Sequence, residues 1–156
     1  GVRVIRALEC LVDGVAVSSS RIRKLLAAGQ VHDGNRLLGY DYTITGTVIH
    51  GNAIGNRIGF PTANMQLSSA KLLPLSGVYS ANVQIDDCNY SAIVNIGNNP
   101  TVGNLQISVE AHVMNFEGDL YEQTISIKFL HFIRNERKFT SLDELRSQIQ
   151  KDIQSL

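Results

Sequence analysis

The residues best suited to chemistry follow a glycine-rich stretch, where Pro61 precedes Thr62 and Asn64. Proline fixes its own φ angle and favours an extended conformation in the residue before it. In an extended segment Thr62 and Asn64 point to the same side, because strand side chains alternate between two faces. A hydroxyl and an amide carbonyl are hard oxygen ligands of the kind that Mg²⁺ prefers. The alternative, that both side chains cap a turn, fits the residues equally well.

Three glycines, Gly51, Gly55 and Gly59, recur at every fourth position before this segment. Glycine permits positive φ angles and close approach of other groups to the backbone. Concave runs of backbone amides bind phosphate, although this spacing matches neither the P-loop nor the Rossmann pattern. Residues 51–59 are therefore interpreted either as a phosphate-binding loop or as a flexible connection between two strands.

Glu110 is the candidate for proton transfer. It lies within an alternating segment, on the face opposite Val109 and Ala111. A carboxylate beside a phosphate site can accept the proton of a hydroxyl that attacks phosphorus. The alternative is an ordinary solvated strand glutamate. His112 faces the same way, and we interpret it as a neighbour or a hydrogen-bonding support rather than as the base.

Two further polar segments have both a functional and a plain interpretation. Residues 95–101 are rich in Asn, Gly and Pro, so they either line a nucleotide pocket or form a turn. Residues 134–139 carry several charges, and by themselves they indicate a solvated charge run before the last helix.

The elements that would position these residues are mostly strands. Alternating, β-branched patterns predict strands at residues 42–50, 77–85, 89–94, 107–113 and 122–129. A closing helix is predicted after Ser141, with Glu144 at the capping-box spacing. Five or six antiparallel strands with short turns favour a small closed or nearly closed barrel.

The first 39 residues have a different pattern. Extended segments within residues 2–17 flank a turn at residues 13–14, and serines 18–20 offer a helix N-cap. Helices are predicted at residues 21–28 and 31–38, ended by Gly29 and Gly39.

Composition limits the protein class. The 156 residues are 44% hydrophobic and 18% charged, which is typical of a soluble globular domain, with or without an appendage. Fourteen basic and fourteen acidic residues cancel, which disfavours a nucleic-acid partner, and no apolar run is long enough to span a membrane. Cys10 and Cys88 match no metal or redox spacing, so we expect a reducing compartment, the cytoplasm. Because the chain begins at Gly1 without Met, we expect a fragment of a longer protein.

The order of the motifs resembles the riboflavin kinase family, in particular the kinase module of bacterial bifunctional riboflavin kinase/FMN adenylyltransferases. The resemblance covers about residues 38–156, and we place the kinase domain at residues 39–156. It rests on His50-Gly51, Gly55, Gly59-Phe60-Pro61-Thr62-Ala63-Asn64, Gly77-Val78-Tyr79, Asn95-Ile96-Gly97, Pro100-Thr101, Val109-Glu110-Ala111-His112, Gly118-Asp119-Leu120-Tyr121 and Arg134-Asn135-Glu136.

The resemblance implies a mainly-β fold, a six-stranded antiparallel Greek-key barrel with a C-terminal helix, preceded by a short helical segment. It implies transfer of the ATP γ-phosphate to the ribityl hydroxyl of riboflavin, giving FMN. Glu110 then corresponds to the catalytic base, and Thr62 and Asn64 correspond to ligands of Mg²⁺ or Mn²⁺. The implied ATP contacts are Gly51, Gly55, Arg57, Gly59, Pro61, Asn95, Gly97 and Asn98, and the implied flavin contacts are Tyr79, Arg134, Glu136 and Phe139.

Two positions depart from the family pattern. The family often has a basic residue where this chain has Asn56, followed by Arg57, and often has an aromatic residue where this chain has Val102.

Residues 1–38 resemble the end of the adenylyltransferase module. Ser19, Ser20 and Arg23 would there meet ATP phosphates at a helix N-terminus, which favours anions. The module's His-x-Gly-His motif is absent from this sequence. We therefore expect the full-length protein, but not this fragment, to convert FMN to FAD.

Two other functions remain as alternatives. A flavin-binding barrel without catalysis would keep an apolar pocket but would not need Thr62, Asn64 and Glu110 together. A nucleic-acid-binding barrel fits the fold class but not the zero net charge. The expected partners are riboflavin and ATP, with no nucleic acid and no membrane.

Overall fold

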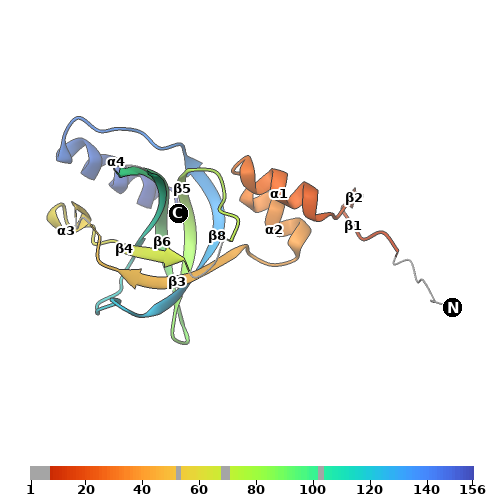
Figure 1. Cartoon of the computed structure of the whole chain (residues 1–156), viewed down its shortest axis with the longest axis horizontal. Coiled ribbons are helices and arrows are strands. Elements are labelled where there is room, and N and C mark those ends of the chain that lie inside the picture. Colours follow the sequence, from red (N-terminus) through yellow and green to blue (C-terminus); the bar gives the residue numbers. More distant parts are fainter. Residues whose placement is uncertain (1–7, 52–53, 68–70, 102–103) are drawn as a thin grey trace.

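The computed structural model describes residues 8–51, 54–67, 71–101 and 104–156, with the side chains of residues 54, 56 and 98–106 outside that description. Six strands close into an antiparallel barrel in the order β3-β4-β7-β6-β5-β8 (Figure 1). They are β3 (Thr43–Ile49), β4 (Ala63–Leu67), β5 (Gly77–Ile85), β6 (Cys88–Thr101), β7 (Asn104–Val113) and β8 (Thr124–Arg134). After the β5-β6-β7 meander, β8 returns to pair with β5, which is Greek-key connectivity. The fold class expected from the sequence is confirmed.

Helices lie on two sides of the barrel. The helices are α1 (Ser19–Ala27), α2 (Val31–Leu38), α3 (Ile54–Arg57) and α4 (Leu142–Gln154), and a small hairpin of β1 (Leu11–Val12) and β2 (Val15–Ala16) precedes them. Figure 1 shows α3 and α4 on one side of the barrel and the α1–α2 pair on the other. No helix in the described part of the chain is both long enough and apolar enough to cross a membrane.

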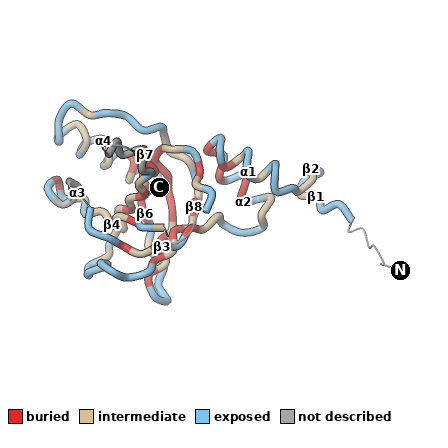
Figure 2. The backbone as a smooth tube through the Cα atoms, in the orientation of Figure 1, coloured by how far each residue is buried: buried red, intermediate tan, exposed pale blue. Residues whose placement is uncertain are grey.

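The barrel interior is filled by alternate residues of each strand, as the period-2 pattern requires. Figure 2 shows the buried positions running along the strands. The interior positions include Ile44, Val48, Met65, Tyr79, Val83, Val94, Ile96, Val109, Ala111, Ile125, Ile127 and Phe129. The residues between them face outward, so any site built from those residues lies on the outside of the barrel.

The predicted helix boundaries are close to the observed ones. The Ser18 hydroxyl accepts a hydrogen bond from the Arg21 amide at 3.3 Å, and α2 ends at Gly39 in the left-handed conformation. At α4 the Ser141 hydroxyl accepts from the Glu144 amide at 3.2 Å. The Glu144 carboxylate accepts from the Thr140 amide rather than from the Ser141 amide. Of the two hydrogen bonds expected for a capping box, the one to the Ser141 hydroxyl is therefore the one present.

Other expectations need correction. Residues 95–101 are not a loop, because β6 continues to Thr101 and pairs with β7 along this length. Part of the glycine-rich stretch forms the single helical turn α3 rather than an open loop. The strand predicted at 122–129 begins at Thr124 and extends to Arg134. The extended segment expected at residues 2–4 lies outside the described residues, as does Val102.

The α1–α2 pair shares the hydrophobic core of the barrel. Leu26 and Val31 are buried within the same cluster as the interior strand residues. The Asn35 amide donates a hydrogen bond to the Phe129 carbonyl of β8 at 2.8 Å, and the Leu75 amide donates to the Leu26 carbonyl at 3.0 Å. The α1–α2 pair is therefore docked on the barrel.

Candidate functional site

A row of polar side chains crosses the outer face of the barrel. Asn64 on β4 lies directly opposite Glu110 on β7, and Glu110 lies opposite Asn95 on β6. The row continues from Asn95 through Val78 on β5 to Arg134 at the end of β8. Directly opposed residues share a face of the sheet, so these side chains are neighbours. The segments that carry them lie far apart in the sequence, and closure of the barrel brings them together.

A pocket of about 240 Å³ lies over this row, and we call it the α4 pocket. Its polar lining comes from Thr62, Asn95, Glu110, His112, Arg134, Glu136, Arg137 and Asp152. Its apolar lining includes Ile58, Phe60, Val78, Ile93, Phe139, Leu145 and Ile149. Val78 and Ile93 face outward from the barrel yet are buried, as expected for residues that α4 covers. The pocket thus combines an apolar wall with convergent polar groups, which is typical of a small-molecule site.

Glu110 has an unusual environment for a strand glutamate. Burial, and secondly the negative charge of Glu136, raise the pKa of its carboxyl above the ordinary value. Glu136 also contacts the Asn95 amide nitrogen at 3.5 Å, and a Cβ on Gly97 would collide with the Glu136 carboxylate. Glycine at position 97 therefore allows the segment after β8 to approach β6 closely. A carboxyl of raised pKa in a cleft suits general base catalysis near neutral pH.

The α4 wall is attached to the barrel through Arg134. Its Nε donates to the Asp152 carboxylate at 3.0 Å, and its Nη2 donates to Asp152 at 2.8 Å. The Asp152 side chain is 3% exposed and that of Arg134 is 21% exposed. The neighbouring Arg137 guanidinium lies 4.9 Å from the centre of the Phe139 ring and pairs with Glu144 on α4. The charge run at residues 134–139 therefore forms an edge of the pocket, although residues 135–138 are exposed to solvent.

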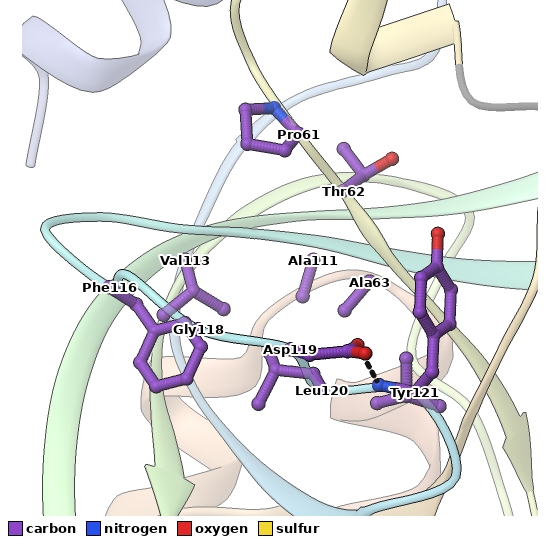
Figure 3. Close-up of a pocket in the computed structure, with 11 residues that line it drawn as sticks. Pro61, Thr62, Ala63, Ala111, Val113, Phe116, Gly118, Asp119, Leu120 and Tyr121 are labelled. Atoms are coloured by element: carbon purple, nitrogen blue, oxygen red, sulfur yellow. Dashed lines mark hydrogen bonds between the residues drawn. The ribbon is translucent and has the colours of Figure 1, made fainter.

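A second pocket, of about 200 Å³, lies at one end of the barrel, and we call it the barrel-end pocket. Its lining residues are Val48, Pro61, Thr62, Ala63, Ala111, Val113, Phe116, Gly118, Asp119, Leu120 and Tyr121. Figure 3 shows Phe116 and Tyr121 at opposite ends of the pocket, with Thr62 above. Asp119 accepts a hydrogen bond from the Tyr121 amide at 2.9 Å, and the Tyr121 ring stacks on His50 with ring centres 3.8 Å apart.

Thr62 joins the two pockets, because it lines both of them. Asn64 follows it on β4, beside Glu110. A Cβ at Gly51 would collide with the Asn64 side-chain amide, so glycine at position 51 lets the backbone pack directly against Asn64. The structure therefore brings Gly51, Thr62, Asn64 and Glu110 close to one another.

Several predicted site residues lie elsewhere. Tyr79, expected to contact flavin, is fully buried in the barrel, where its ring packs edge-on against Phe129 and Phe132. Its hydroxyl donates to the Leu75 carbonyl, and burial raises the pKa of Tyr79 to about 12. The side chain points inward because Tyr79 shares the strand parity of the other core residues of β5. The structure does not bring Tyr79 to either pocket.

The remaining predicted residues fall into three groups. Gly55 and Pro61 line the α4 pocket and the barrel-end pocket, respectively. Arg57 and Gly59 are exposed at the end of α3 and line neither pocket. The backbones of Asn56 and Asn98 are described but their side chains are not.

The residues assigned to an adenylyltransferase remnant lie far from both pockets. Ser19, Ser20 and Arg23 are exposed on α1, on the opposite side of the barrel from α4 (Figure 1). They cannot act in the α4 pocket of this chain.

Sequence reasoning missed the apolar wall and the anchor of α4. Leu145 and Ile149 have helical spacing, which puts them on one face of α4, but the spacing does not show that this face borders a pocket. Asp152 gave no signal, because its role depends on pairing with Arg134 across the fold. His50 and Tyr121 occur in the family-like motifs, yet their stacking appears only when β3 and the 116–121 segment meet.

Comparisons with known proteins show which proteins this chain resembles. The sequence model of the riboflavin kinase family, Flavokinase, matches residues 38–156. The bifunctional riboflavin kinase/FMN adenylyltransferase of Haemophilus influenzae is 40% identical over 147 residues, which are 94% of this chain and 47% of that protein. The Escherichia coli K12 protein of the same name is 39% identical over 140 residues, 89% of this chain and 44% of its own length. The chain thus spans about half the length of the curated relatives it matches.

Two solved structures are similar. A crystal structure described as a macrolide-efflux protein from Streptococcus pneumoniae has a TM-score of 0.86 and 36% identity, covering 89% of this chain and 46% of that chain. The riboflavin kinase from Trypanosoma brucei has a TM-score of 0.50 and 26% identity, covering 72% of this chain and 74% of its own.

Proposed function

The chain belongs to the riboflavin kinase family, and we propose that it transfers the γ-phosphate of ATP to the terminal ribityl hydroxyl of riboflavin, giving FMN. The observation that carries the proposal is the row on the outer face of the barrel, where Asn64, Glu110 and Asn95 lie side by side next to Thr62. Glu110, whose carboxyl has a raised pKa, lines the α4 pocket, and Thr62 lines both pockets.

Each substrate has a pocket that suits its chemistry. The α4 pocket has the apolar wall that a flavin ring needs, with Arg134 and Glu136 at its edge. The barrel-end pocket has an aromatic rim at Tyr121 and contains Thr62, so we assign it to ATP. The γ-phosphate would then lie near Thr62, and the ribityl chain would extend from the α4 pocket toward Glu110.

Glu110 would act on the attacking hydroxyl. Its carboxylate accepts the hydroxyl proton as the hydroxyl oxygen bonds to phosphorus and the bond from phosphorus to the ADP oxygen breaks. Phosphoryl transfer requires mainly positioning and charge stabilisation, so one base and a few polar groups suffice. Asn95 and Gly97, expected from the sequence to contact ATP, lie on the flavin side of Glu110 and would position that carboxylate and Glu136 instead.

The residues present fit a divalent cation. The Thr62 hydroxyl and the Asn64 carbonyl are hard oxygen donors beside a carboxylate, and Mg²⁺ commonly takes few ligands from protein. Within the described residues no group of three His, Cys, Asp or Glu side chains forms a protein-only metal cage. When bound, Mg²⁺ or Mn²⁺ would neutralise charge on the β- and γ-phosphates. Thr62 and Asn64 would hold it.

The metal assignment predicts a change in the magnesium requirement. Thr62→Ala and Asn64→Ala each remove one oxygen donor, so each variant should need a higher Mg²⁺ concentration for half-maximal rate. A titration of activity with Mg²⁺ at fixed ATP measures this. Unchanged midpoints in both variants would exclude the two residues as ligands.

The kinase proposal is tested by incubating the protein with riboflavin and Mg-ATP and separating the flavins by chromatography. FMN formation is the expected result. Riboflavin that binds without conversion would favour the alternative of a flavin-binding barrel without catalysis.

For a longer protein that carries the preceding module, we propose further conversion of FMN to FAD. The same chromatography should find no FAD from this chain, because Ser19, Ser20 and Arg23 lack the rest of that module.

A further inference from the structure

His112 makes a hydrogen bond to the Pro61 carbonyl, and this bond has no role in the mechanism proposed above. His112 lies two residues after Glu110 on β7, and its Nδ1 is 2.8 Å from the Pro61 carbonyl oxygen. A carbonyl oxygen can only accept, so Nδ1 must carry the proton. The Phe60 ring meets the imidazole edge-on, with ring centres 5.3 Å apart. Two contacts from the segment before Thr62 therefore hold one side chain of β7.

The hydrogen bond between His112 and Pro61 lies at the end of the β4–β7 pairing. Backbone pairing between β4 and β7 begins at Ala63 opposite Ala111, so the next pair along would be Thr62 and His112. Pro61 has no amide hydrogen and cannot donate to the ladder. The His112 side chain thus makes a link to the Pro61 carbonyl just where backbone pairing ends.

We propose that His112 is a positioning residue that fixes the Pro61–Thr62 peptide to β7 and so sets the Thr62 hydroxyl relative to Glu110. The inference rests on the proposed kinase function. Strand β7 then carries both Glu110, the proposed base, and His112, which holds the segment with Thr62. The position of Thr62 is thereby tied to that of Glu110. Displacement of a positioned group by about 1 Å can reduce a rate by about 10²-fold, so a fixed peptide here matters for the rate.

The role is distinct from that of a base. With Nδ1–H donating to Pro61, Nε2 is the nitrogen that could still accept a proton, so the two roles must be separated by substitution. An asparagine side chain can place an amide N–H near the position of Nδ1, but it cannot accept a proton as a base. Replacement by Asn therefore separates the two roles.

The experiment compares His112→Asn with His112→Leu, which has a similar shape but no donor. His112→Leu should lose about 10–100-fold in kcat and require more Mg²⁺, as is typical when a group supporting a metal ligand is removed. His112→Asn should stay within about threefold of the parent in kcat. Because His112 itself lines the α4 pocket, circular dichroism and thermal unfolding, rather than riboflavin binding, show that the variants are folded. The proposal would be overturned if His112→Leu had the kcat and Mg²⁺ requirement of the parent. It would also be overturned if His112→Asn lost as much kcat as His112→Leu.

A second measurement does not depend on activity. Long-range ¹H–¹⁵N spectra of the labelled protein report which nitrogen of the neutral His112 ring is protonated. The proposal requires the Nδ1–H form, and the Nε2–H form would overturn it. Should the parent protein make no FMN, the kinase proposal fails, while the ring tautomer still decides whether His112 holds Pro61.

Discussion

At the scale of single residues, the surroundings of Glu110 determine when its carboxylate can accept a proton. Burial and the charge of Glu136 both favour the protonated form, so they raise the pKa. The base form is then lost at a higher pH than for an exposed glutamate. Activity should therefore fall on the acid side as the pH drops through this raised pKa.

Replacing Glu136 by Gln should move that limit. Glu136→Gln removes the negative neighbour, so the pKa of Glu110 should fall and the acid limb of the kcat/KM profile should shift to lower pH. Parent and variant are measured under the same conditions, so that ionisation of ATP affects both equally. Glu117→Gln, at an exposed glutamate, is the control and should leave the limb in place. An acid limb that stays fixed or moves to higher pH in Glu136→Gln would contradict the account.

The side of a strand on which a residue lies could be predicted from its spacing in the sequence. A role that depends on contact with a residue far along the chain could not. Alternation in an extended segment predicted that Thr62 and Asn64 share a side, whereas the position of Glu110 opposite Asn64 depends on strand pairing. Tyr79 was assigned to the flavin from the resemblance alone. Its parity with Ala81, Val83 and Ile85, all buried, was the signal that placed it in the core. Asp152 could not be found from sequence, because its partner Arg134 lies on another element.

At the scale of elements, α4 forms one wall of the proposed flavin site. The Asp152–Arg134 ion pair holds its last turns to β8, and the capping contacts at Ser141 set where the helix begins. Because Asp152 is almost completely buried, loss of its carboxylate leaves the Arg134 guanidinium without its partner in a mostly dry position.

Asp152→Ala should reduce both stability and flavin affinity. Breaking a buried ion pair typically costs about 3–5 kcal/mol, and the partial exposure of Arg134 lowers our expectation to about 2–4 kcal/mol. Riboflavin KM should rise because the α4 wall loses its anchor, and denaturant unfolding with steady-state kinetics measures both. Gln150→Ala, exposed on the same helix, should change neither. An Asp152→Ala protein with parental stability and KM would show that the pair does not hold α4.

Two elements could not be predicted because their signals are not local. Residues 98–101 extend β6 because β7 is there to pair with, although Asn, Gly and Pro favour a turn. The helical turn α3 is too short to show a periodic pattern, and the glycines around it indicated a loop. In both cases the rest of the fold decided the local structure.

At the scale of the whole molecule, the α1–α2 pair and the barrel form one core. The sequence predicted these helices, but no local pattern indicated that they dock on the barrel. The buried Leu26 and Val31 and the hydrogen bonds of Asn35 show why the pair is docked. Strand patterns indicated five or six antiparallel strands, but only the family resemblance predicted a six-stranded closed barrel, since strand order has no local signal.

Asn35→Ala should weaken this docking. Asn35 donates to the Phe129 carbonyl at 2.8 Å and accepts from the Tyr42 amide at 2.8 Å, so its loss leaves two backbone groups without partners. The free energy of unfolding should fall by about 1–3 kcal/mol, with kcat unchanged because α2 lies away from both pockets. Arg36→Ala, which breaks the exposed pair with Asp13, should cost about 0–1 kcal/mol. Equal effects of the two substitutions in chemical denaturation would contradict the role of Asn35.

The central claim is that the outer-face row around Glu110 performs phosphoryl transfer. Single-turnover conversion of bound riboflavin by Mg-ATP, followed by chromatography, tests it most directly when the parent is compared with Glu110→Gln. Loss of a general base should slow the chemical step by about 10²–10⁴-fold, while riboflavin fluorescence reports unchanged binding. Glu9→Gln, at an exposed glutamate outside both pockets, should keep the parental rate. Formation of FMN by Glu110→Gln at the parental rate would contradict the account.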